Sequence, residues 1–154
     1  QLNHFIENID DSPLSNAAIR KGEARFLRAF NYFAMVKRYG GVPLITKETS
    51  LDASEEEIYP ERSTEQECYD FIIDELTDIA DVLEERPEAG RAGKGAALTL
   101  LSRVALYAGS IQQFGNVENN GLNGIPKGTE KNYYQIAADA AKRVMTECHY
   151  SLYQ

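Results

Sequence analysis

Residues 28–45, RAFNYFAMVKRYGGVPLI, decide the fold of this 154-residue chain. Aromatic and aliphatic side chains recur there at the three- and four-residue spacing of an amphipathic helix, as far as Tyr39. Gly40 or Gly41 can then take the left-handed conformation that often ends a helix. Pro43 prevents the helix from continuing, because its ring excludes the helical hydrogen bond. The stretch therefore predicts a long helix with a sharp C-terminal boundary.

Helical periodicity extends over most of the chain, and no segment shows the strict alternation of a half-buried strand. The predicted helices cover residues 15–39, 64–85, 95–112 and 133–148, and residues 1–9 are expected to be the tail of one more. A capping box from Ser63 to Gln66 is expected to begin the second long helix. The rings of the first helix lie on two adjoining faces, so they are expected to pack on two sides. The fold is predicted to be all-α.

The connections between these helices differ in length. Residues 86–94 form a short joint, which should fold the second and third long helices into an antiparallel hairpin. Residues 40–62 and 113–131 are long loops without strong periodicity, and loops of this length are often functional surfaces. We therefore expect tetratricopeptide-like stacked helix hairpins with two long loops, in a single helical domain over residues 1–154.

Charge and cysteine spacing exclude several function classes. Sixteen Lys and Arg against 24 Asp and Glu leave a net charge of −8, and the basic residues do not cluster. Nucleic acid is therefore not expected as a partner. Cys68 and Cys148 lack metal-ligand spacing, so they are expected to be free, partly buried thiols, with a single disulfide as the alternative. No cofactor-binding or metal site is predicted.

The loop from Gln112 to Gly128 is the strongest local candidate for ligand contact. Its side-chain amides and one aromatic ring suit sugar hydroxyls and sugar faces. Turn formation explains the same residues, because Asn and Gly tolerate left-handed backbone. The candidate ligand-binding residues are Phe114, Asn116, Asn119, Asn120 and Asn123.

A run of carboxylates on the second long helix raises the question of catalysis. These residues are Asp74, Glu75, Asp78, Asp81, Glu84 and Glu85. Paired carboxylates can hydrolyse glycosides, but this spacing mostly describes the solvated face of an amphipathic helix. We interpret the run as a solvated face, and no catalytic residue is predicted.

Four blocks of the chain, in this order, resemble the SusD/RagB-like nutrient-binding lipoproteins of the bacterial outer membrane. They read GEARFLRAFNYFAMVKRYGGVPLI (22–45), ERSTEQECYDFIIDELTDIADVL (61–83), GRAGKGAALTLLSRVALYAGS (90–110) and YYQIAADAAKRVM (133–145). The first block is the most specific, and the order of the other three adds weight.

The resemblance implies an all-α, tetratricopeptide-containing binding protein rather than an enzyme. Such proteins are tethered to the cell surface by an N-terminal lipid, which this chain does not include, and they capture oligosaccharides for import through a SusC-like TonB-dependent transporter. Because family members are several hundred residues long, the chain is expected to be the helical N-terminal part of a longer protein. The chain has no Trp, so any flat aromatic sugar platform is expected to lie elsewhere.

Two other functions stay open at this point. The first is a helical adaptor that binds a protein partner in a stacked-helix groove and is unrelated to glycan uptake. The second is an all-α glycoside hydrolase, which depends on the acidic helix alone.

Overall fold

The computed structural model of the chain describes residues 1–50, 52–129 and 131–151, and its regular structure there is helical. The long helices are α2 (Ala17–Tyr39), α4 (Glu65–Ala80), α5 (Lys94–Phe114) and α6 (Tyr133–Glu147). The short ones are α1 (Leu2–Asn8), α3 (Glu55–Ile58) and the 3₁₀ turns η1 (Ile9–Asp11) and η2 (Asn119–Gly121). The all-α prediction is confirmed.

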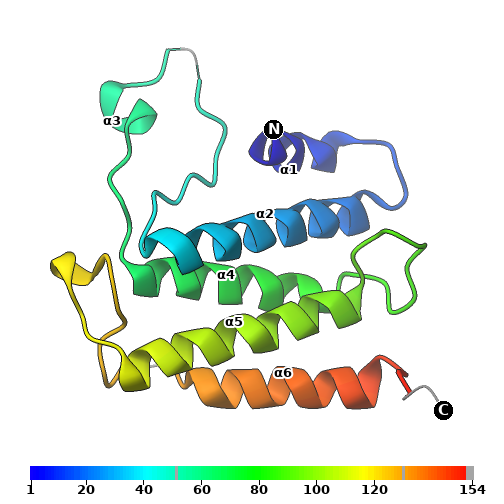
Figure 1. Cartoon of the computed structure of the whole chain (residues 1–154). Helices are drawn as coiled ribbons and strands as arrows, with labels where there is room; N and C mark the ends of the chain where they lie inside the picture. The colour runs from blue at the N-terminus through cyan, green and yellow to red at the C-terminus, as the bar shows by residue number, and fades with distance from the viewer. Residues whose placement is uncertain (51, 130, 152–154) are drawn as a thin grey trace.

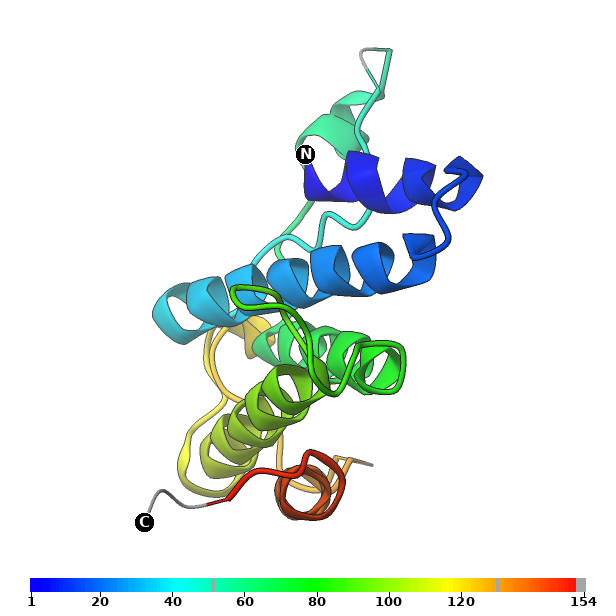
Figure 2. The same ribbon diagram turned by 90° about the vertical axis from the view of Figure 1, so that its right-hand side faces the viewer.

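Helices α1, α2, α4, α5 and α6 stack in chain order, and consecutive long helices run antiparallel, whereas α3 lies apart from the stack in the loop after α2 (Figure 1). A view turned by 90° shows α4 and α5 offset from each other between α2 and α6 (Figure 2). This is the predicted stack of helix hairpins. The N-terminus lies beside α1 and the last described residues lie beside α6, at opposite ends of the stack (Figure 1).

The core lies between the stacked helices, and α4 and α5 contribute most of it. Small residues of α5, such as Ala97, Ala105 and Ala108, are fully buried and let the neighbouring helices approach. Cys68 and Cys148 are both buried and free, as predicted. Within the described residues, no helix combines the length and the apolar character needed to cross a membrane.

Two details of the predicted helices are wrong. The capping box of α4 is formed by Thr64 and Glu67, one residue later than predicted. Helix α4 ends at Ala80 rather than at residue 85, because the following turn carries the side chain of Leu83 back into the core. The two-sided packing predicted for α2 is confirmed, because α2 lies between α1 and α4, although its Phe30 is 50% exposed.

Candidate functional site

The loop after α5 is built on a tight hairpin turn. Residues Glu118 and Asn123 face each other in an isolated antiparallel bridge, with their backbone groups 2.8 and 3.3 Å apart. Between them, Asn119 and Asn120 have φ values of 50° and 55°, in the left-handed region. Asparagine tolerates this region better than most residues. Two of the candidate asparagines therefore shape the turn with their backbone and leave their side chains exposed.

Backbone contacts hold this loop against the ends of α2 and α4. The Gly41 amide donates a hydrogen bond of 2.6 Å to the carbonyl oxygen of Leu122. The Gly124 amide donates one of 2.5 Å to Oε2 of Glu65. Burial raises the pKa of the Glu65 carboxyl, although the Gly124 hydrogen bond opposes that shift. The loop is thus a fixed part of the fold.

The five candidate ligand residues do not share one environment. Phe114 ends α5 with 75% of its surface exposed, and Asn116 is exposed as well. Asn123 is half-buried, and its side-chain oxygen lies where a Cβ on Gly40 would stand. Phe114, Asn116, Asn119 and Asn120 are therefore free to touch a ligand, whereas Asn123 packs against the end of α2.

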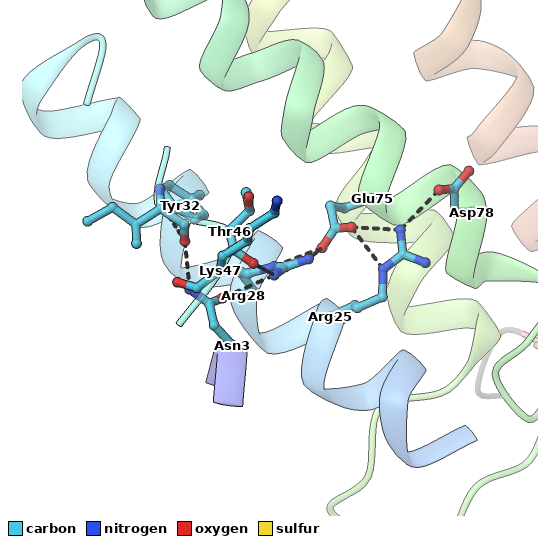
Figure 3. Close-up of polar contacts among 9 residues, drawn as sticks. Asn3, Arg25, Arg28, Tyr32, Thr46, Lys47, Glu75 and Asp78 are labelled. Atoms are coloured by element: carbon cyan, nitrogen blue, oxygen red, sulfur yellow. Dashed lines mark hydrogen bonds and ion pairs between the residues drawn. The ribbon is translucent and has the colours of Figure 1, made fainter. Parts of the chain in front are cut away.

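The acidic face of α4 is not simply solvated, which corrects the sequence-based interpretation at one residue. Glu75 is buried and lies between two guanidinium groups of α2 (Figure 3). Arg28 approaches its Oε2 at 2.7 Å, and Arg25 approaches its Oε1 at 2.6 Å. The two arginines thus engage both oxygens of this carboxylate.

Arg28 also joins this ion pair to the N-terminal helix and to the long loop after α2. Its Nη1 donates hydrogen bonds of 3.0 Å to Oδ1 of Asn3 and to the carbonyl oxygen of Thr46 (Figure 3). Asn3 in turn donates to the carbonyl oxygen of Lys47, at 3.0 Å. The cluster therefore holds together α1, α2, α4 and the start of the loop, which is a structural role.

Sequence reasoning did not identify Arg28 and Glu75 as partners. They are 47 residues apart and come from helices that pack only in the folded state. The available signal was an arginine on the apolar face of α2, and a buried charge of that kind needs a partner.

A wide groove in the surface lies between α2 and α5, with a volume of about 400 Å³. Phe26 and Phe30 line its α2 side, and Leu100 and Arg103 line its α5 side. The described residues contain no cluster of three or more His, Cys, Asp or Glu side chains that could hold a metal ion.

Comparison with protein families matches residues 1–106 to SusD-like proteins, a family described as starch-binding associating with outer membrane. A SusD-like protein of Formosa agariphila is 40% identical over 107 residues, which are 70% of this chain and 21% of the relative. The chain spans about a fifth of the length of the curated relatives that it matches.

Solved structures agree over nearly the whole chain. A SusD-like protein from Bacteroides fragilis superposes with a TM-score of 0.76 at 34% identity, covering 98% of this chain and 25% of that one. A structure determined with xylogluco-oligosaccharide superposes with a TM-score of 0.73 at 27% identity, covering 99% of this chain and 28% of that one.

Proposed function

The chain belongs to the SusD-like family, and on that premise we propose that it is the helical scaffold of a longer protein that captures oligosaccharides at the cell surface. The observation that carries the proposal is the match of the helical stack, over 99% of its length, to a structure that holds xylogluco-oligosaccharide. The captured glycan would pass to a SusC-like TonB-dependent transporter. An N-terminal lipid outside this chain would anchor the protein at the outer membrane.

Binding without catalysis fits the polar groups of the chain. Both oxygens of the buried Glu75 carboxylate of α4 are engaged by arginines of α2, Arg25 and Arg28, so this carboxylate joins two helices. The alternative function, a helical adaptor, requires a protein partner in place of a glycan, and capture of such a partner would support it.

Calorimetry of the full-length protein against a panel of glycans tests the proposal. We expect measurable affinity for at least one oligosaccharide from the full-length protein, and weak or no affinity from residues 1–154 alone. The reason is that the chain spans only about a fifth of its relatives and contains no Trp. If no glycan in the panel gives a heat of binding above the heat of dilution, the glycan-binding proposal is refuted.

The candidate loop receives its own test in the same experiment. Phe114 and Asn116 are exposed and make no contact that the fold requires, so Phe114→Ala and Asn116→Ala should leave the melting temperature unchanged. If the loop contacts the glycan, each should weaken binding by roughly 1 kcal/mol, the worth of one stacking or hydrogen-bonding group. Unchanged affinity in both variants would assign these residues to the turn alone.

A further inference from the structure

The hairpin turn after α5 contains both Asn–Gly pairs of the chain, Asn120–Gly121 and Asn123–Gly124. An asparagine followed by glycine is chemically labile, because the glycine nitrogen can reach the side-chain carbonyl carbon without a Cβ in the way. Asparagine is accordingly one of the thermolabile residues of proteins. The two pairs share one loop and one sequence context, but the fold places them in different surroundings.

Asn120 lies at the tip of the turn, where the loop projects from the side of the stack (yellow in Figure 1). Its side chain is exposed, and so is that of Asn119 before it. The Gly121 amide donates a hydrogen bond of 3.1 Å to the carbonyl oxygen of Glu118, which is an exposed residue as well. Exposed turn hydrogen bonds of this kind open by local fluctuation at little cost in free energy. The Gly121 nitrogen is therefore available to the Asn120 side chain.

Asn123 is held more firmly. Its side chain is half-buried against Gly40, and the following Gly124 is buried. The Gly124 amide donates to Oε2 of Glu65, whose own surface is only 8% exposed. A hydrogen bond from a backbone N–H to a carboxylate is about twice as strong as one to a neutral acceptor. The nitrogen that would attack the Asn123 side chain is thus both engaged and shielded from water.

We propose that Asn120 is a site of spontaneous deamidation, and that the hydrogen bond between Glu65 and Gly124 protects Asn123 from the same reaction. The Gly121 nitrogen gives its proton to hydroxide and bonds to Cγ of Asn120. The bond from Cγ to Nδ2 breaks, and Nδ2 takes a proton from water and leaves as ammonia. Water then opens the cyclic imide at either carbonyl, which leaves aspartate or isoaspartate at position 120. The reaction consumes one water, releases one ammonia and needs no oxidant or reductant.

The product alters the turn in one of two ways. Aspartate adds a negative charge close to Glu118, in a chain whose net charge is already −8. Isoaspartate carries the backbone through its Cβ, which lengthens the turn and displaces the bridge between Glu118 and Asn123. Either product changes the exposed face of the candidate loop. The reaction requires only water and the turn, so it does not depend on glycan binding.

Timed peptide mapping of the full-length protein in mildly alkaline buffer measures the two sites separately. Mass spectrometry detects the replacement of an amide by a carboxyl, and fragmentation distinguishes aspartate from isoaspartate. Asn123 is the matched internal control, because it has the same following residue in the same loop. In the native protein Asn120 should react at least about tenfold faster than Asn123, which corresponds to the strength of one hydrogen bond to a charged group. In urea the two rates should converge, because the protecting contact is lost.

Glu65→Ala tests the source of the protection. Loss of the acceptor should accelerate the reaction at Asn123 towards the rate at Asn120, and the rate at Asn120 should stay the same. Glu61→Ala is the control, since Glu61 is an exposed acid shortly before α4, and it should change neither rate. Circular dichroism checks that the variants are folded. If Glu65→Ala is unfolded, Glu65→Gln replaces it, and this neutral acceptor should protect Asn123 less than the carboxylate does.

Three results would overturn the deamidation site. They are equal rates at Asn120 and Asn123 in the native protein, a faster reaction at Asn123, and a native protein in which Asn120 stays intact while both sites react in urea. A rate at Asn123 that no folded Glu65 variant changes would show that Glu65 is not the protecting group.

Discussion

At the residue scale, the two glycines that end α2 have different tasks. Gly40 has φ 66° and ψ −139°, a backbone conformation that side chains with a Cβ rarely adopt. Gly41 has no positive φ, and it is required because the chain passes close to the start of α4. A Cβ on Gly41 would overlap the carbonyl oxygen of Ser63 and crowd the backbone of Thr64. Of the two glycines predicted to take the positive φ, Gly40 is the one that does.

We predict that Gly41→Val destabilises the chain by at least about 2 kcal/mol, because the obstructing atoms are backbone and cannot rotate away. Urea unfolding followed by circular dichroism measures the change. Gly90→Ala is the control, since its φ is 86° but no atom lies within 4 Å of the added Cβ. It should cost only about 1 kcal/mol of backbone strain. A Gly41→Val chain that unfolds like the unmodified one would refute the close approach.

At the element scale, buried charge rather than apolar contact alone sets how α4 sits on α2. The side chains of Arg28 and Glu75 are 9% and 7% exposed, and each completes the hydrogen bonding of the other. Arg25 contacts Asp78 as well as Glu75, and the side chain of Asp78 is 63% exposed. The two carboxylates are about one helical turn apart. Because Glu75 is buried and Asp78 is exposed, we expect Glu75 to contribute more to stability.

Glu75→Ala should lower the free energy of unfolding by about 3 kcal/mol, because it leaves Arg28 buried without its counter-charge. Asp78→Ala on the same helix face should cost less than about 1 kcal/mol, since water screens the exposed pair. Denaturant titration of the two variants gives both numbers. Equal losses would show that burial does not distinguish the two carboxylates.

At the scale of the whole molecule, an ion-pair network joins the end of α4, the start of α5 and the end of α6. Lys94 at the start of α5 reaches Asp81 at 3.0 Å and Glu147 at 2.8 Å. Arg143 of α6 reaches the same two carboxylates, at 2.6 and 2.9 Å. Hydrogen bonds from Arg143 and then Lys94 lower the pKa of Glu147 to about 2, and those from Lys94 and Arg143 lower the pKa of Asp81.

This network predicts that the packing of α6 weakens in acid. A carboxylate whose pKa is lower in the folded state stabilises the fold fully above its unfolded pKa, which is 4.5 for Glu147. That stabilisation should disappear progressively as the pH falls from 4.5 towards about 2. The loss can be measured as faster amide hydrogen exchange in α6 than in α2 across that pH range. Glu147→Gln should reduce the pH dependence, and an unchanged profile would contradict the role of this carboxylate.

Most of the fold was predictable because its signals are local. Helical periodicity, the glycines after Tyr39 and the short joint before α5 placed all four long helices, and the family blocks agreed with them. The candidate loop was predictable as a turn, since its asparagines and glycines favour left-handed backbone. Its attachment through Glu65 and Gly41 was not, because those contacts join residues more than 50 positions apart.

By itself, the sequence determined the all-α class, the helix boundaries to within a few residues and the family. The class and the boundaries follow from side-chain spacing along one stretch of chain, and the family follows from the resemblance of four sequence blocks in their order. Only the tertiary structure decided which charges are buried, which glycine is needed for space, and which aromatic rings remain in an open groove. Those properties depend on what the neighbouring helix brings to the same place. The pairing of Arg28 with Glu75, and the partial burial of Phe26 beside an exposed Phe30, arise only when α2, α4 and α5 pack together.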